Sequence, residues 1–536
     1  MREEKTKERD AAVCANSESH YEERRLTILK TEIQKDLELF TIRPYRSKRL
    51  KGYCNRMSQD RTTALYDDNV ADMLVTQGFS IEDAPRSIYK VEKLYEALSM
   101  YAPGKIGKPQ RCSEYTAGLS LARACFARPK DRERLDVLPF TPATISMITS
   151  NPGGSAGLTN FGSNKAESQT RALERGLQTL KGEKQPEPCL AFARTQFNDK
   201  TRLVWGYPYS MTAIEGLVAY PLIQKFKGGS TPMAFSMTSG ALGTKLRVAS
   251  YHKEWAYSLD MSKFDATISG ELIHEAFSIL QTWFDPHQIE PVSGMTVKEI
   301  FKVIERYFIH TTIVMPDSRL YLGKRHGVPS GSFFTQIIDS IVNVIIGGAI
   351  SARFSLNVSK REIFVLGDDL LMWSNRKMDL DKIAAWANQT FSVRLHGSEK
   401  SNIFHRTEPI HYLGRDWDHG LPSLDESEII KRMAHPESFR RYDADPDVRQ
   451  RQVGMLILAY AATYWAGWRI AHKLLYPEGM WYGNGSSNID VNVYHYGRGE
   501  KEVNPDFLTG LQRYLRRYHG IGTTHDSPDS GYQIWL

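Results

Sequence analysis

The chain has 536 residues, too many for one ordinary hydrophobic core, so several subdomains are expected. Apolar residues make up 41% of the chain and aromatic residues 11%, which excludes a disordered protein. Lysine and arginine (69) exceed aspartate and glutamate (62), a mild basic excess that suits a polyanionic partner. The five scattered cysteines form no Cys-x-x-Cys pair, which favours a reducing compartment without a zinc site.

Residues 61–150 alternate helical patterns with loops and carry no recognisable chemistry. Before them, the basic residues interleaved with Tyr45 and Tyr53 form either a nucleic-acid contact or a solvated charged face. Apolar residues at helical spacing predict a helix over about residues 21–40. The loop that follows these patterns begins with Asn151, contains Ser155 and Gly157, and stays polar to about Asn164. It is either a plain linker or a loop whose glycines allow another backbone to pass close by.

A basic segment follows, with Arg194, Lys200 and Arg202 close together in the sequence. Lys200 and Arg202 lie on the same face of the predicted strand. Arginine offers a fork of donors and lysine a point charge, so the cluster could hold a triphosphate. An exposed basic surface strand is the alternative.

Two aspartates, Asp260 and Asp265, follow the next predicted strand. The apolar residues before Asp260 predict a strand, and Asp265 comes five residues later, near the start of a predicted helix. This spacing is a weak signal by itself. It gains weight as a second source of carboxylates for the acidic turn described below.

A Gly/Ser loop with Ser330 and Gly331 leads into an apolar helix. Thr335, Asp339 and Asn343 recur every four residues and form one polar stripe on this helix. Because buried polar groups need partners, the stripe is either a self-satisfied network or a surface facing a polar ligand such as a ribose.

The stretch Ile363–Trp373 predicts a strand, a tight turn at Gly367 and a second strand. The turn presents Asp368 and Asp369. Two adjacent carboxylates beside apolar strands are costly unless a cation neutralises them, and a divalent metal takes carboxylate oxygen ligands. An ordinary hairpin with acidic turn residues is the alternative.

Lys400 follows a predicted helix, and it could donate a proton to a leaving group if its pKa were lowered. A short hairpin around Gly414 and Arg415 comes next, and the pattern becomes helical from about residue 421. The longest uncharged apolar run, residues 453–468, is shorter than the roughly 18 residues of a membrane span and predicts a buried helix.

In this order, the motifs resemble a viral RNA-dependent RNA polymerase, most of all those of the partitivirus and picobirnavirus group of double-stranded RNA viruses. The resemblance covers roughly residues 150–420. It implies an α+β fold, a closed right hand of fingers, palm and thumb, with an antiparallel palm sheet and a largely helical thumb. The implied domains are an arm bridging fingers and thumb (1–60), fingers (61–250, with the palm starting near 205), palm (251–275), a fingers insertion (276–325), palm (326–420), thumb (421–485) and its C-terminal tail (486–536).

The resemblance also implies roles for single residues. Asp260 and Asp368, supported by Asp369, would hold two Mg²⁺ ions, with Mn²⁺ as a substitute. Lys400 would be the general acid. The remaining implied contacts are the triphosphate set Arg194, Lys200 and Arg202, the ribose set Asp265, Ser330, Gly331 and Thr335, the template loop Ser155 and Gly157, and the primer grip Gly414 and Arg415.

One position departs from the pattern of positive-strand RNA virus polymerases. They usually carry Asn four residues after the helix threonine, where this chain has Asp339, and Asn343 lies one turn further on. Either residue could complete the ribose network.

The implied activity is RNA-directed RNA synthesis from NTPs, for viral RNA replication. The implied partners are single- and double-stranded RNA, NTPs and a capsid protein, for a monomer without a membrane span, located in the host cytoplasm inside the virus particle. A reverse transcriptase is the nearest alternative, although such enzymes usually carry Tyr-x-Asp-Asp where this chain has Leu366-Gly367-Asp368-Asp369. A non-catalytic RNA-binding or capsid-associated protein is the other.

Overall fold

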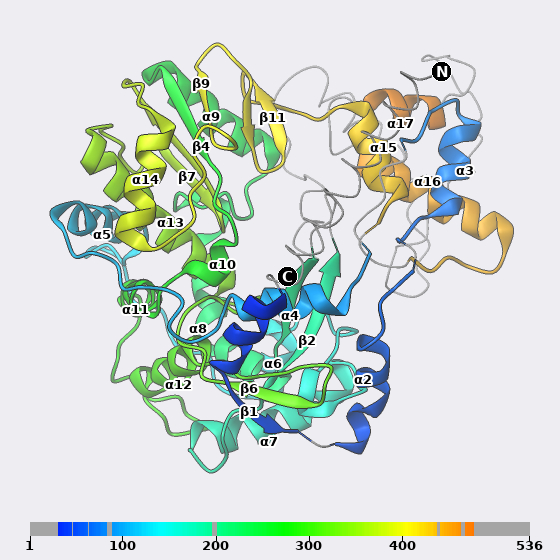
Figure 1. Ribbon diagram of the computed structural model, residues 1–536, viewed down its shortest axis with the longest axis vertical. Helices are drawn as coiled ribbons and strands as arrows, with labels where there is room; N and C mark the ends of the chain where they lie inside the picture. Colours follow the sequence, from blue (N-terminus) through cyan, green and yellow to red (C-terminus); the bar gives the residue numbers. More distant parts are fainter. Residues whose placement is uncertain are drawn as a thin grey trace, which may run out of the picture.

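The computed structural model describes residues 30–45, 47–62, 64–82, 88–195, 201–436, 440–461 and 467–475. Within these ranges the chain forms three β-sheets and a separate group of helices (Figure 1). One large hydrophobic core joins most of the elements, and three smaller clusters complete it. The chain is thus α+β, as predicted from the sequence.

A four-stranded antiparallel sheet lies at the upper left of Figure 1. Its strand order is β7 (Ile363–Leu366), β8 (Asp369–Ser374), β4 (Trp255–Leu259) and β9 (Asn402–His405). The predicted strand–turn–strand and the predicted strand before Asp260 are therefore confirmed.

Both faces of this sheet are covered, which explains its nearly continuous apolar strands. Helix α13 (Thr335–Phe354) packs on one face, against β7 and β8. On the other face, Phe364 and Leu371 pack against α9 (Ser239–His252) and the strands β10 (Ile410–Tyr412) and β11 (Arg415–Asp418). These two strands form a three-stranded sheet with β12 (Leu421–Ser423) and confirm the predicted short hairpin.

Helix α13 is the central helix of the fold. Every residue from Ile337 to Ser351 is buried, so the helix is apolar all round apart from its polar stripe. It is long and apolar enough to cross a membrane, but 83% of that stretch is buried inside the protein. Such burial is that of a core helix.

A five-stranded sheet forms the lower part of the molecule in Figure 1. The pair β2–β5 is parallel and the other pairs are antiparallel. Residues 41–44 at the N-terminal side add the edge strand to this sheet. In spatial order, the strands are β1 (Thr41–Pro44), β6 (Arg319–Leu322), β5 (Ile313–Val314), β2 (Cys189–Thr195) and β3 (Thr201–Gly206).

The helical group at the upper right of Figure 1 has its own core. Helices α15 (Glu426–Ala434), α16 (Pro446–Ala461) and α17 (Trp468–Leu475) pack there with α3 (Asp68–Thr76). We call these four helices the helical module. The helical pattern predicted after residue 421 is confirmed, and α3 joins it from far away in the sequence.

The remaining helices surround the two larger sheets. Residues 30–38 are helical, within the helix predicted over residues 21–40, whose first part lies outside the described residues. The others are η1 (Lys48–Leu50), α2 (Lys51–Met57), α4 (Val91–Ser99), α5 (Ser113–Phe126), α6 (Pro142–Ile148), η2 (Gly157–Asn160), η3 (Ala166–Ser168), α7 (Gln169–Leu180), α8 (Tyr209–Phe226), η4 (Lys227–Gly229), α10 (Phe264–Thr267), α11 (Gly270–Gln281), α12 (Val297–Ile309) and α14 (Leu380–Phe391).

Candidate active site

Two acidic segments that are far apart in the sequence meet at one end of the four-stranded sheet. Strand β4 ends at Leu259, which pairs with Leu370, and β7 and β8 close with Leu366 opposite Asp369. Asp260 follows Leu259 directly, so it lies beside the turn that carries Asp368 and Asp369. We call these three aspartates the acidic cluster.

The carboxylates of the acidic cluster crowd one another. The pKa of Asp369 is raised to about 7, first by reduced solvation of its carboxyl group and then by the charges of Asp368 and Asp260. Arg202 on β3 opposes this rise and lies with its Nη2 atom 3.9 Å from Oδ2 of Asp368. The cluster therefore has more negative charge than its neighbours neutralise.

The donor set suits a hard divalent cation. Carboxylate oxygens are the ligands that Mg²⁺ prefers, and the sheet end brings three of them together. Among the described residues, however, no three His, Cys, Asp or Glu side chains form a ready-made metal site. The carboxylates of the acidic cluster therefore suit Mg²⁺ by their chemistry, but they are not yet arranged as the ligands of a bound ion.

Asp265 and Asp339 form a second, coupled carboxyl pair behind the acidic cluster. Each side chain affects the pKa of the other, and the charge of Asp368 acts on both. Burial, followed by the charge of Asp368, raises the pKa of Asp265 to about 6. Burial and the charge of Asp265 raise the pKa of Asp339 well above its usual value.

The two alternatives for the ribose contact in the polar stripe of α13, Asp339 and Asn343, have different neighbours. Asp339 faces Asp265, and its Oδ1 atom is buried without a hydrogen-bond partner among the described residues. Asn343, one turn further on, instead donates from Nδ2 to the carbonyl oxygen of Gly367 at 3.0 Å. Asp265 lies in the short helix α10, and Ser269 caps a new helix, α11, rather than continuing the first.

The Gly/Ser loop before α13 is fixed to the basic strand β3. The Oγ atom of Ser330 accepts from the backbone N–H of Trp205 and donates to the carbonyl of Leu203. Gly331 has a φ of +137°, and a Cβ atom there would lie 2.4 Å from the Trp205 carbonyl oxygen. Only glycine allows this approach. The hydroxyl of Thr335 donates to the Pro329 carbonyl and closes the loop.

Glu215 supports the same loop and was not singled out from the sequence. It is fully buried on α8 and accepts from the Ser332 hydroxyl and, at 2.9 Å, from the backbone N–H of Phe333. Burial raises its pKa to about 7. A lone charged residue in the otherwise uncharged run of residues 209–223 was the available signal.

The basic segment forms a hairpin beside the acidic cluster. Arg194 on β2 pairs directly with Arg202 on β3, so two guanidinium side chains leave the same region of the hairpin. Lys200 lies outside the described residues. The structure thus brings Arg202 to the acidic cluster and Arg194 to its neighbourhood.

The segment with Lys400 is tied to Asp260. The backbone N–H of His396 donates to the Asp260 carbonyl, and Oγ of Ser401 accepts from the Asp260 N–H while donating to the His396 carbonyl. The side chain of His396 lies 3.8 Å from Oδ2 of Asp260 and 3.3 Å from Nζ of Lys400. His396 and Ser401 were not identified from the sequence, where a histidine or serine in a polar turn gives no signal.

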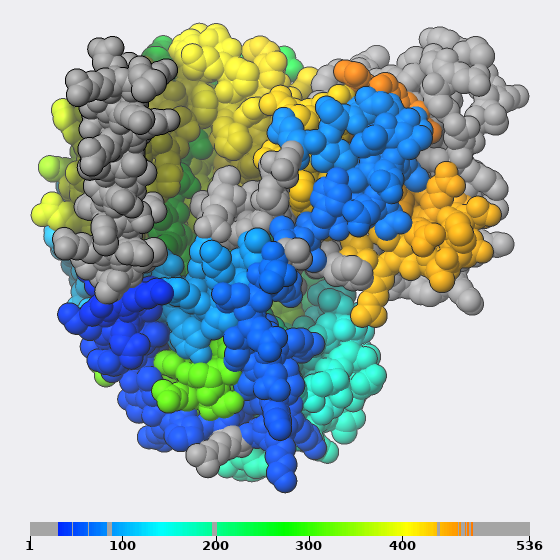
Figure 2. All heavy atoms as spheres, turned by 45° about the vertical axis from the view of Figure 1, so that its right-hand side comes forward, coloured from blue at the N-terminus to red at the C-terminus, as the bar shows by residue number. Residues whose placement is uncertain are grey.

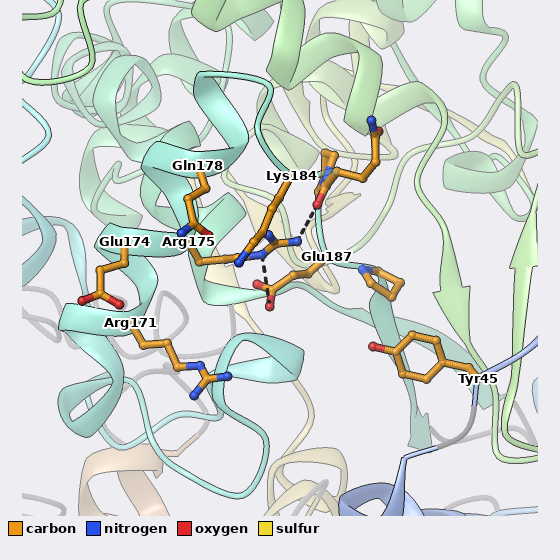
Figure 3. A pocket seen from close by; sticks show the side chains of 10 residues that line it. Tyr45, Arg171, Glu174, Arg175, Gln178, Lys184 and Glu187 are labelled. Atoms are coloured by element: carbon orange, nitrogen blue, oxygen red, sulfur yellow. Dashed lines mark hydrogen bonds and ion pairs between the residues drawn. The ribbon is translucent and has the colours of Figure 1, made fainter.

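The loop with Ser155 and Gly157 is anchored by buried hydrogen bonds from its end. Oε2 of Glu187 accepts from Thr159 in η2 and from Ser210 in α8, both at 2.7 Å. Figure 3 shows the other oxygen of Glu187 facing Arg175, at 3.6 Å, in a pocket of about 620 Å³ between α7 and the start of β2. The loop therefore has a fixed base.

Gly414 and Arg415 lie in the β10–β11 hairpin, whose turn residues Leu413 and Gly414 both have positive φ. Arg415 is buried, and its Nη1 atom donates to the Ser239 hydroxyl at the start of α9. The hairpin tip is thus joined to the helix behind the four-stranded sheet.

Comparison with known proteins gives the family. Residues 197–474, just over half of the chain, match the family described as viral RNA-dependent RNA polymerase. The chain belongs to this family. The matched range contains β3 with Arg202, the acidic cluster and α13, and the resemblance inferred from the motifs is confirmed.

Curated relatives carry the same name. The RNA-directed RNA polymerase of Cryptosporidium parvum virus 1 is 35% identical over 170 residues, 30% of each chain. That of Atkinsonella hypoxylon virus is 24% identical over 311 residues, 49% of this chain and 46% of the relative. The chain thus spans less than half the length of these relatives.

A solved structure supports the fold over almost the whole chain. The RNA-dependent RNA polymerase of a human picobirnavirus superposes with a TM-score of 0.64, covering 94% of this chain and 98% of the other at 13% identity. The chain therefore has the right-hand polymerase fold, in which the four-stranded sheet is the palm.

Proposed function

We propose that this protein is an RNA-directed RNA polymerase that replicates and transcribes the genome of a double-stranded RNA virus by two-metal nucleotidyl transfer. One observation supports the proposal most directly. Asp260 and the Asp368–Asp369 turn converge at one end of the palm sheet, and Arg202 lies 3.9 Å from Asp368. Carboxylates from two chain segments next to a guanidinium group suit phosphoryl transfer.

The reaction joins the 3′-oxygen of the growing RNA to the α-phosphate of an NTP and releases pyrophosphate. Asp260 and Asp368, with Asp369 in support, would hold two Mg²⁺ ions, or Mn²⁺ in their place. When bound, these ions would activate the attacking oxygen and stabilise the leaving one. Arg202, with Arg194 and Lys200, would offset the charge of the triphosphate. Lys400 would give the departing pyrophosphate a proton.

The carboxyl pair Asp265–Asp339 would face the ribose. A 2′-hydroxyl is both a donor and an acceptor, and the buried Oδ1 of Asp339 is an acceptor without a partner among the described residues. Ser330, Gly331 and Thr335 would hold the loop that shapes this side of the pocket. Asn343 bonds to Gly367, which favours Asp339 as the ribose contact.

Base pairing with the template, rather than contacts with the protein, would select each nucleotide. Ser155 and Gly157 would guide the template, and Gly414 and Arg415 would support the primer end.

The domain limits given from the sequence are part of this proposal, as is closure of the hand by the N-terminal arm. The participation of residues 41–44 in the five-stranded sheet is compatible with such an arm. Helix α3, which these limits place in the fingers, packs in the helical module and would join fingers to thumb. A capsid partner, a monomeric state and a place inside particles in the host cytoplasm complete it.

The test is Asp368→Asn in a primer-extension or de novo synthesis assay with Mg²⁺ and NTPs. We expect incorporation to fall by at least about 100-fold, because a ligand of the metal pair loses its charge. RNA binding should remain. Asp131→Asn is the control, since Asp131 is an exposed aspartate outside the site. Wild-type incorporation by Asp368→Asn would refute the assignment.

The same assay decides between the alternatives. Preference for NTPs over dNTPs is expected from the ribose pair, whereas equal or better use of dNTPs would indicate a reverse transcriptase. A wild-type protein that binds RNA but incorporates neither, with Mg²⁺ or Mn²⁺, would indicate a non-catalytic RNA-binding or capsid-associated protein.

A further inference from the structure

The turn that presents the acidic cluster is held from behind by α13. The backbone N–H of Gly367 donates to Oγ of Ser340 at 3.0 Å, and the Gly367 carbonyl accepts from Nδ2 of Asn343 at 3.0 Å. Both side chains are fully buried. Gly367 has a φ of +62°, so its two peptide groups face away from the β7–β8 ladder and need partners elsewhere.

Each of the two side chains is committed to this contact. The Ser340 hydroxyl donates to the Gln336 carbonyl at 2.7 Å, which leaves its lone pairs for the Gly367 N–H. The Oδ1 atom of Asn343 is buried without a partner among the described residues. Such an orphan acceptor is costly, and rotating the amide would set Oδ1 against the Gly367 carbonyl. The amide is therefore kept in place by its bond to the turn.

Helix α13 is a rigid base for these bonds. It packs so closely on α5 that a Cβ atom at Gly118 would lie 2.1 Å from the Ile345 carbonyl. Its N-terminal loop is fixed to Glu215 through Ser332 and Phe333. Movement of the turn relative to the rest of the palm would break both bonds to Gly367.

We propose that Ser340 and Asn343 are positioning residues that fix the Gly367 turn and thereby set the approach of Asp368 to Asp260 for divalent-cation binding. This inference rests on the proposed function for its catalytic consequence. Helix α13 would then have two roles: it would present Asp339 to the ribose and hold the turn that carries Asp368. Ser340 and Asn343 would not contact a substrate, because both act through the turn.

The test compares three variants that each remove one hydrogen bond between a side chain of α13 and a backbone group outside the helix. Ser340→Ala leaves the Gly367 N–H without its acceptor, and Asn343→Leu leaves the Gly367 carbonyl without its donor. Ser351→Ala is the matched control, because Ser351 is also buried in α13 and accepts the Val358 N–H at 2.9 Å. It lies roughly 16 Å further along the helix, at 1.5 Å per residue.

Three quantities are measured for each variant: the affinity for Mn²⁺ by electron paramagnetic resonance of the free ion, the Mg²⁺ concentration for half-maximal RNA synthesis, and the thermal unfolding midpoint. We expect Ser340→Ala and Asn343→Leu to weaken Mn²⁺ binding and raise the Mg²⁺ requirement by about 3- to 10-fold, the scale of one net hydrogen bond. The KM for NTP at saturating Mg²⁺ should stay near that of the wild type. Ser351→Ala should lower only the unfolding midpoint.

Unchanged Mn²⁺ affinity in folded Ser340→Ala would overturn the inference, even if its unfolding midpoint falls. Asn343→Leu gives an independent answer if the serine variant is unstable. The outcome is separable from the proposed function: if the wild type makes no RNA but binds Mn²⁺ through Asp368, weaker binding in Ser340→Ala still supports the positioning role. Equal loss of Mn²⁺ affinity in Ser351→Ala would show a general loss of stability and overturn it.

Discussion

At the scale of single residues, the site contains carboxyl groups in three different environments. Asp260 is half exposed at the sheet end, Asp265 and Asp339 form a pair whose pKa values are both raised by burial, and Glu215 is fully buried beneath the Gly/Ser loop. Burial raises the pKa of Glu215 to about 7, so the folded protein keeps this group protonated where an unfolded chain would not. This makes Glu215 a source of pH-dependent stability outside the acidic cluster.

We predict that Glu215→Gln stabilises the protein at pH 8 and has little effect at pH 5. The folded-state pKa lies above the unfolded value near 4.3–4.5, so the wild type loses stability as the pH rises through this window and levels off above about 7. The loss amounts to about 3 kcal/mol for this shift. Thermal unfolding of both proteins at the two pH values measures it. Exposed Glu133→Gln is the control, and parallel pH profiles of wild type and Glu215→Gln would contradict the prediction.

At the scale of elements, the loop 327–334 connects the palm to the five-stranded sheet. Ser330 bonds to β3, and Ser332 and Phe333 bond to α8. This loop ends at α13, whose Ser340 and Asn343 hold the acidic turn. One continuous segment therefore relates the basic hairpin to the acidic cluster, and its Gly331 lies against the Trp205 carbonyl of β3.

We predict that Gly331→Ala lowers the free energy of unfolding by about 1–3 kcal/mol, because its Cβ atom would meet the Trp205 carbonyl and its φ is unfavourable for alanine. Gly104→Ala separates the two causes. Gly104 also has a positive φ of +84°, but nothing lies within 4 Å of its added Cβ atom. Chemical denaturation measures both variants. If both lose the same stability, the contact with Trp205 has no cost of its own.

At the scale of the whole molecule, α3 ties the N-terminal part of the chain to the helical module. Figures 1 and 2 both show this segment, in blue, against the orange C-terminal helices. Asp67, which caps α3, is buried and accepts from Arg440 at 2.9 Å and from Tyr442 at 2.6 Å. The Asp67 carboxylate thus neutralises Arg440, which lies 373 positions later in the chain.

We predict that Asp67→Ala destabilises the helical module by about 3–5 kcal/mol, since it leaves the partly buried Arg440 guanidinium without its carboxylate. Asp68→Ala, at the exposed neighbouring position, should cost less than about 1 kcal/mol. Hydrogen exchange or limited proteolysis across α15 and α16 is the measurement. Equal protection in the two variants would show that the Asp67–Arg440 pair does not stabilise the module.

The sequence by itself determined the local elements and the chemistry of the candidates. Alternating and helical apolar patterns, the glycine turn and the order of the motifs predicted β4, the β7–β8 hairpin, α13 and the family, because these signals are local in the chain. Only the tertiary structure decided which side chains meet. Sequence spacing could not assign Asp339 to Asp265 and Asn343 to Gly367, since both lie on one stripe of one helix. Nor could it place Glu215, His396, Ser401 or α3, because long-range packing, not local pattern, selects the partners of a buried polar group.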